Sequence, residues 1–262
     1  IGGDPPCHSL VLIENRCNLG FAGGLNTGLE YALARNDFDY AWLLNNDTVV
    51  HEGALGHLVK RGEADPGIGI CGSTLLYYHR PDTIQALGGE YSPWLGAVRH
   101  IGALREFRPF PNQGIVEQRM DYVVGASMFV SKAFLRNIGL LSEEYFLYFE
   151  ELDWAIRSRN RFPLGYAPKS LVYHKEGGSL GSSLIGRRRS LTADFYGIRN
   201  RIRISRKYHP WTLPVVYMGL AFAVINRLRR GQRDRARMIL SLMLRGAGGG
   251  RIPDGKSSPL PA

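Results

Sequence analysis

Short apolar runs alternate with helical patterns through the first two thirds of the chain. The runs have the length of a strand and are apolar throughout, as strands buried on both faces are. The segments between them repeat apolar residues every three or four positions, which is typical of amphipathic helices. We predict strands at 10–13, 40–44, 68–71, 121–130 and 170–174, and helices at 25–35, 52–61, 134–138 and 150–159. Alternation of this kind predicts an α/β fold with a Rossmann-like, mainly parallel sheet flanked by helices.

The rest of the chain has weaker periodicity. Residues 77–118 are rich in glycine, proline and aromatic residues, which favours loops and short hairpins. A flexible Gly/Ser-rich loop is predicted at 177–186. We expect a main domain at 1–208, a basic helical tail at 209–245 and a disordered Gly/Pro/Ser-rich end at 246–262.

The tail combines an apolar stretch with flanking positive charge. Sixteen uncharged residues at 211–226 lie between Arg206-Lys207 and Arg227, slightly fewer than the roughly 17–25 residues of a spanning helix. A helix in the membrane interface, with its arginines on anionic headgroups, fits this pattern. A buried docking helix and a membrane span are the alternatives.

The net charge of +10 is concentrated in the same region. Between Tyr196 and Arg251 there are thirteen Lys or Arg residues and one acidic residue, Asp234. Such asymmetry indicates an anionic partner, and we expect a membrane surface. We expect no nucleic-acid partner, because the basic residues flank an apolar stretch instead of interleaving with exposed aromatic residues.

Cysteine spacing argues against disulfide and zinc chemistry. The three cysteines, Cys7, Cys17 and Cys71, form no CxxC pair and cannot all pair internally. We therefore expect plain buried thiols and a reducing compartment.

Polar residues directly follow the apolar run at 40–44. Asn45, Asn46 and Asp47 stand there with no intervening turn residue, at the kind of strand end where α/β sheets bind ligands. Read together with Glu150-Glu151 and His174 further along the chain, the carboxylate suggests a divalent metal that holds a phosphorylated donor. Because Asn and Asp also favour turns and helix caps, a purely structural role is the alternative.

Two further groups with candidate chemistry come later in the chain. Glu150 and Glu151 open a predicted helix directly after an aromatic run. Desolvation by those rings would raise a carboxylate pKa and improve it as a proton acceptor near neutrality, although acids at a helix start also complement the helix dipole. We expect Asp153 to cap the helix or orient an acceptor hydroxyl. His174, which ends a predicted strand, is either a ligand or a structural histidine.

A glycine-rich turn at 20–24 precedes the first predicted helix. Its backbone N–H groups are candidates for contact with phosphate at the helix N-terminus. The spacing matches neither the dinucleotide-binding pattern nor a P-loop. Tight packing between a strand and a helix explains the glycines equally well.

These features, in this order, resemble family 2 glycosyltransferases, in particular the bacterial rhamnosyltransferase-like branch. The resemblance covers about residues 10–208, and the combination of motifs makes it specific. The motifs are NLGFAGGLNTG at 18–28, LLNNDT at 43–48, YVVGASM at 122–128, YFLYFEELDWAIR at 145–157 and VYH at 172–174.

The resemblance implies a GT-A fold and inverting transfer of a single sugar from a nucleotide-sugar donor. Glu151 is the expected general base, with Glu150 and Asp153 beside it in the catalytic set. Asp47 and His174 are the expected ligands of Mn²⁺ or Mg²⁺. The expected donor-binding residues are Asn18, Gly20, Phe21, Gly23, Gly24, Asn26, Asn45, Asn46 and Gly125.

Two departures from the family pattern shape the functional prediction. The usual Glu-Asp pair is Glu150-Glu151 here, and no segment matches the family's first strands, which predicts an N-terminally truncated chain. We predict a hexosyltransferase, with dTDP-rhamnose as the guessed donor, that acts on a cell-envelope polysaccharide or a lipid-linked acceptor. Its expected location is cytoplasmic, peripheral on the inner face of the cell membrane. A catalytically inactive protein that binds a membrane or a partner is the alternative.

Overall fold

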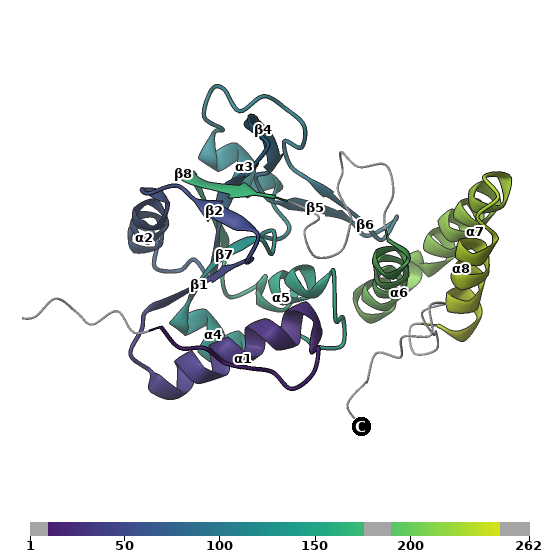
Figure 1. The fold of residues 1–262 in the computed structure, drawn as a ribbon, viewed down its shortest axis with the longest axis horizontal. Coiled ribbons are helices and arrows are strands. Elements are labelled where there is room, and N and C mark those ends of the chain that lie inside the picture. The colour runs from purple at the N-terminus through teal and green to yellow at the C-terminus, as the bar shows by residue number, and fades with distance from the viewer. Residues whose placement is uncertain (1–9, 176–189, 247–262) are drawn as a thin grey trace, which may run out of the picture.

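The computed structural model describes residues 10–175 and 190–246 (Figure 1). Its strands are β1 (Tyr40–Leu44), β2 (Thr48–Val50), β3 (Ile70–Tyr77), β4 (Arg80–Ala86), β5 (Gly89–Ser92), β6 (Ala97–His100), β7 (Ser127–Ser131) and β8 (Leu164–His174). Its helices are α1 (Gly20–Arg35), α2 (Ala54–Ala64), α3 (Gln113–Arg119), α4 (Lys132–Ile138), α5 (Glu150–Ser158), α6 (Leu191–Tyr208), α7 (Leu213–Arg229) and α8 (Arg233–Arg245). In Figure 1, α7 and α8 stand at one end of the molecule, with α6 between them and the sheet.

The strands form a mixed sheet, so the predicted mainly parallel sheet is wrong. The strand order is β1-β7-β3-β8-β2, with β4 paired to β3. Among the described strands of this sheet, β3 and β8 pair in parallel and every other pair is antiparallel. Three residues connect β1 to β2, whereas a parallel crossover needs a dozen or more. This short connection reverses the chain, and β7 enters between β1 and β3 in the opposite direction.

Most of the other predicted elements are confirmed at nearby boundaries. Helices α1, α2, α4 and α5 and strands β1, β3 and β8 occupy the predicted places. The predicted strand at 121–130 is shortened to β7, because a turn precedes Ser127. Residues 77–118 contain the expected hairpin, formed by β5 and β6, and also the start of α3, which their sequence does not predict.

The predicted strand at 10–13 is wrong for this structure. These residues form no strand, and the side chains of Leu10 and Leu12 are almost fully exposed. A strand needs a neighbour for its backbone N–H and C=O groups, and no described strand pairs with this segment. An apolar run indicates the tendency to form a strand but not the presence of a partner.

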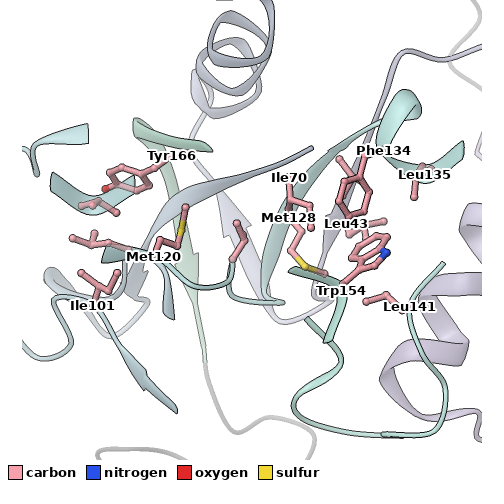
Figure 2. Close-up of a cluster of buried hydrophobic side chains, with 14 of the residues drawn as sticks. Leu43, Ile70, Ile101, Met120, Met128, Phe134, Leu135, Leu141, Trp154 and Tyr166 are labelled. Carbon is pink, nitrogen blue, oxygen red and sulfur yellow. The ribbon is translucent and has the colours of Figure 1, made fainter. Parts of the chain in front are cut away.

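The main core lies between the sheet and the helices that carry the candidate chemistry (Figure 2). Leu43 of β1, Met128 of β7, Phe134 of α4 and Trp154 of α5 share one buried cluster. The rings of Phe134 and Trp154 meet edge to face with centroids 5.0 Å apart, and Trp154 Nε1 donates to Gly139 O at 2.9 Å. This packing fixes α5, and therefore the two glutamates of its first turn, against the sheet.

The C-terminal helices form a second core. Val216, Leu220 and Val224 of α7 are buried among side chains of α6 and α8. One stretch of the described chain, Pro210–Arg229, is long and apolar enough to cross a membrane, with a mean hydropathy of 1.3. The predicted loop at 177–186 and nearly all of the predicted Gly/Pro/Ser-rich end lie outside the described residues.

Candidate active site

Strand register brings Asp47 and His174 together. β2 and β8 pair antiparallel with Thr48 opposite His174, so the residue before β2 reaches the end of β8. Asp47 Oδ1 lies 3.0 Å from His174 Nε2, and the two side chains are 20% and 13% exposed. Thr48 holds the preceding turn, since its N–H and its hydroxyl both donate to Asn45 O. The two predicted metal ligands therefore meet although 127 residues separate them.

Gln85 on β4 orients the imidazole of His174. Its side chain is buried, and its Oε1 lies 3.0 Å from His174 Nδ1. An amide oxygen only accepts hydrogen bonds, so Nδ1 carries a proton and Nε2 of the neutral ring is an acceptor. Nε2 then faces the Asp47 carboxylate, which is a second acceptor. A proton or a cation between these two atoms resolves the conflict.

The pair fits a divalent cation in both chemistry and spacing. A carboxylate oxygen with an imidazole nitrogen suits Mn²⁺ at least as well as Mg²⁺. Two ligands at right angles on an ion with bonds of about 2.1 Å lie about 3 Å apart, as Asp47 Oδ1 and His174 Nε2 do. Residues 10–175 and 190–246 contain no cluster of three or more His, Cys, Asp or Glu side chains that could hold a metal. An ion at this pair would therefore keep coordination positions for a phosphorylated ligand and water.

Glu151 contacts the turn that precedes β7. Its Oε1 accepts from Gly125 N–H at 3.2 Å, and a Cβ at position 125 would lie 2.4 Å from that oxygen. Only glycine allows this approach of the carboxylate. The carbonyl of the next residue, Ala126, accepts from Asn45 N–H at 3.2 Å. One turn thus bonds to Glu151 and to Asn45, which lies two residues before Asp47.

The two glutamates in the first turn of α5 have raised pKa values. Burial raises the pKa of Glu151, against the opposing effect of backbone N–H groups at Glu151 and Gly125. Burial, and then the charge of Glu151, raise the pKa of Glu150 well above its usual range. Oε2 of Glu150 has no hydrogen-bond partner among the described residues. This arrangement favours a neutral Glu150 beside a Glu151 that exchanges its proton at higher pH than an ordinary glutamate.

The loop before α5 has a strained backbone. Phe146, Tyr148 and Phe149 have φ angles of 64°, 69° and 76°, in the left-handed region that bulky residues seldom adopt. Each such residue costs roughly 1–3 kcal/mol and persists only where its surroundings hold it. Phe149 is also the residue from which α5 begins. The direction of the first turn of α5 therefore depends on what holds this loop.

Asn200 on α6 holds the loop, and no sequence motif marks it. Its side chain is fully buried. Its Nδ2 donates to the carbonyl oxygens of Tyr145, Leu147 and Tyr148 at 2.8, 2.8 and 3.0 Å. These partners lie more than fifty residues earlier in the chain, so no local pattern reveals the contact. α6 thereby becomes part of the support for the two glutamates.

Asp153 ties α5 to α6 and has no free carboxylate oxygen. Its Oδ1 accepts from Tyr145 OH, Lys207 Nζ and Tyr208 OH, and its Oδ2 accepts from Arg157 Nε. Burial acts to raise its pKa, but the hydrogen bonds from Lys207, Tyr208 and Arg157 hold the pKa below its usual value. The side chain is fully buried. This geometry gives Asp153 a positioning role, and it lends no support to contact with an acceptor hydroxyl.

The glycine-rich start of α1 packs against the same strained loop. Phe21 N–H donates to Phe146 O at 2.7 Å. Gly20 has a φ of 74°, and a Cβ there would lie 2.4 Å from that same oxygen. Asn18 Oδ1 accepts from Gly20 N–H at 2.9 Å. Two of the N–H groups that are candidates for phosphate contact are therefore used within the protein, so close packing accounts for this part of the motif.

The remaining predicted donor-binding residues differ in their surroundings. Asn26 is buried and bonds to Leu141 N and O and to Glu143 Oε1, which makes it an anchor for α1. Gly24 and Asn46 are exposed and accessible to a ligand. Donor contacts at these positions stay predictions.

Comparisons with known proteins agree with the prediction of a glycosyltransferase. Residues 7–133 match the profile of the family described as Glycosyl transferase family 2. The chain is 25% identical over 151 residues to the low-salt glycan biosynthesis hexosyltransferase Agl10 of Haloferax volcanii. This match covers 56% of the chain and 45% of the relative, so the chain spans less than half the length of that protein. The matched profile ends before α5, and Glu150 and Glu151 lie beyond it.

A solved structure has a similar fold. It is the crystal structure of GalNAc-T7 with UDP, GalNAc and Mn²⁺, with a TM-score of 0.55 and 14% identity. The likeness covers 91% of this chain and 46% of the other. At this identity it shows the fold alone, and it supports a GT-A-like arrangement of sheet and helices.

Proposed function

We propose that this protein is a metal-dependent glycosyltransferase that moves one hexose from a nucleotide-sugar donor to an acceptor hydroxyl. The observation that carries the proposal is that the turn at Gly125 and Ala126 bonds both to Glu151 and to Asn45, two residues before Asp47. Asp47 with His174 suits a cation, and Glu151 suits a proton acceptor. The family 2 match at residues 7–133 supports the same reaction class.

Asp47 and His174 are the residues that would hold the cation. When bound, a divalent ion would neutralise negative charge on the diphosphate leaving group. Gln85 contributes by holding the imidazole so that Nε2, and not Nδ1, faces Asp47. The solved structure with the similar fold contains Mn²⁺ together with UDP, which makes Mn²⁺ the first ion to test.

Glu151 would accept the proton of the acceptor hydroxyl. In the reaction, the acceptor oxygen forms a bond to the anomeric carbon, and the bond from that carbon to the diphosphate breaks. The nucleoside diphosphate leaves with the electron pair, and attack from the opposite face inverts the anomeric configuration. Burial raises the pKa of Glu151, which strengthens it as a base.

The donor that we propose first is dTDP-rhamnose, with a cell-envelope polysaccharide or a lipid-linked sugar as acceptor. The donor rests on the resemblance to rhamnosyltransferase-like proteins, and the hexosyltransferase named for glycan biosynthesis supports a hexose. We place the protein on the cytoplasmic face of the cell membrane. The free thiols of Cys17 and Cys71 agree with a reducing compartment, although the expected burial holds for Cys71 and is wrong for Cys17, which is exposed.

Calorimetric titration with UDP, GDP, dTDP and their sugars, with and without Mn²⁺, tests the donor site. We expect binding that requires Mn²⁺ and that Asp47→Ala weakens strongly, because even the loss of a partner of a ligand typically costs about 10–100-fold in metal affinity. Asp39→Ala is the matched control, since that side chain is 91% exposed. Equal binding with and without Mn²⁺, in all three proteins, would contradict the metal site.

An assay of sugar transfer on the same proteins separates the transferase from an inactive binding protein. Release of nucleoside diphosphate that requires both donor and acceptor supports transfer. Binding that depends on Mn²⁺ and Asp47, with no turnover on cell-envelope or lipid-linked acceptors, would favour the inactive alternative.

A further inference from the structure

The outer face of α7 is apolar and exposed to solvent. Its side chains follow one another at spacings of three, four and seven residues, which places them on one side of a helix. They are Trp211 just before the helix, Met218, Phe222, Ile225 and Leu228, and they are 47–68% exposed. Single exposed hydrophobic residues are ordinary, but a continuous apolar face marks an interaction surface.

The opposite face of α7 is already occupied. Val216, Leu220 and Val224 are buried in the cluster that includes Ile202 of α6 and Ile239 of α8. A helix held in this way lies along the domain and presents one side outward. This packing favours a helix that lies on a surface over one that leaves the domain to cross a membrane.

Positive charge adjoins the C-terminal end of the outer face of α7. Arg229, Arg230 and Arg233 are exposed and form no ion pair with the described residues. By contrast, Arg227 and Arg235 both pair with the buried Asp194 inside the helical core. The chain thus separates structural arginines from a group of three that remain available to an external anion.

We infer that the outer face of α7, together with Arg229, Arg230 and Arg233, docks on the surface of an anionic lipid bilayer. Apolar side chains beside exposed arginines match the boundary between acyl chains and headgroups. A second copy of the chain is a poorer partner, because Asp234 is the single acidic residue between Tyr196 and Gly246 and offers little negative charge. The inference deepens the proposed membrane location and is independent of sugar transfer.

Co-sedimentation of the full chain with vesicles tests this inference. One set contains phosphatidylglycerol mixed with phosphatidylcholine, and the other contains phosphatidylcholine alone. We expect binding to the anionic set that falls with added salt. Phe222→Asp should weaken it at least about tenfold, and the double variant Arg229→Gln/Arg230→Gln should weaken it about thirtyfold.

Matched controls keep the result interpretable. Phe110→Asp changes an exposed phenylalanine on a distant loop, and Arg105→Gln/Arg108→Gln removes two exposed arginines elsewhere; neither should alter vesicle binding. All variants should keep the native circular dichroism and the Mn²⁺-dependent nucleotide binding, so failure of docking is distinct from failure of the donor site. Equal binding by Phe222→Asp and the native chain would overturn the inference. So would a dimer in solution that Phe222→Asp dissociates, with no binding to vesicles.

Discussion

The two halves of the candidate site are held in place by different means. At the sheet edge, Asp47 and His174 lie on strand ends, remain partly exposed, and have Gln85 as their buried support. At α5, Glu150 and Glu151 follow a strained loop that Asn200 fastens from another helix. In the first half, Nε2 of a neutral His174 and the Asp47 carboxylate are two acceptors that face each other. The second half is fixed by hydrogen bonds within the protein.

This difference separates the roles of the two halves. At the sheet edge, the Asp47 carboxylate and Nε2 of a neutral His174 need a proton or a cation between them. A bound ligand can therefore supply an interaction that the protein alone does not. The first turn of α5 is preorganised before any substrate binds, through Asn200 and Asp153. Substitutions at the sheet edge should therefore change the binding of metal and donor, and substitutions around α5 should change rate and stability.

The largest effect on rate is expected for Glu151→Gln. Loss of a general base typically lowers kcat by about 10²–10⁴-fold, while Mn²⁺-dependent nucleotide binding should stay unchanged. As the pH is lowered, kcat/KM of the native protein should begin to fall at a pH above the ordinary glutamate pKa of about 4.3. The reason is that burial raises the pKa of Glu151. Steady-state kinetics across pH measures both effects. An unchanged kcat, or an equal loss of nucleotide binding, would remove Glu151 from the role of base.

Asn200→Ala should release the strained loop and misplace Glu151. We expect kcat to fall by about a hundredfold, as a displacement of about 1 Å can cause, with the KM for donor little changed. The acid limb of the pH profile should move as well, because the surroundings of Glu151 change.

The free energy of unfolding should fall in the same variant by about 1–3 kcal/mol, since the carbonyls of Tyr145, Leu147 and Tyr148 lose a hydrogen bond from a buried side chain. Asn137→Ala, at an exposed position of α4, is the matched control. A stability loss without any change in kcat or in the pH profile would leave Asn200 with a structural role alone.

Gln85→Leu should weaken Mn²⁺ binding by about 10–100-fold, because the imidazole loses the acceptor that fixes its tautomer. Water-proton relaxation or calorimetry with Mn²⁺ and UDP measures this affinity, and Gln118→Leu at an exposed position of α3 is the control. Unchanged Mn²⁺ affinity in Gln85→Leu would show that His174 does not depend on this contact.

The smallest effect is expected for Glu150→Gln, and it should stabilise the protein. Burial and the charge of Glu151 raise the pKa of Glu150 in the folded protein. The neutral form therefore stabilises the folded protein fully at pH values below the pKa of the unfolded chain. This stabilisation is lost as the pH rises through the pKa of the folded state. Glutamine stays neutral at every pH. Thermal unfolding should therefore show little difference at about pH 4 and a gain of about 1–2 kcal/mol at neutral pH. A variant that is less stable at neutral pH would contradict a neutral Glu150.

Local patterns predicted the elements whose signals are local. Helices α1 and α5 and strand β1 follow from apolar spacing and polar stops. The direction of β7 and the absence of a strand at 10–13 depend on which segments become neighbours, and apolar spacing contains no such information. α3 lies at the end of a region rich in proline and glycine, where composition favours loops.

The site was predictable only where residues form motifs. Asp47, His174, Gly125 and Glu151 belong to short motifs, and the structure brings Asp47 into contact with His174 and Glu151 into contact with Gly125. Gln85 and Asn200 are single amides whose partners lie 89 and 52–55 residues away. Their importance arises from burial and from tertiary contacts, which the spacing of residues does not encode.

The proposed function depends most on a cation between Asp47 and His174. Anomalous diffraction from crystals of the chain grown with Mn²⁺ and UDP would locate the ion directly. We predict an anomalous peak within about 2.3 Å of both Asp47 Oδ1 and His174 Nε2. A Mn²⁺ peak on the nucleotide but away from both side chains would contradict the proposed metal site.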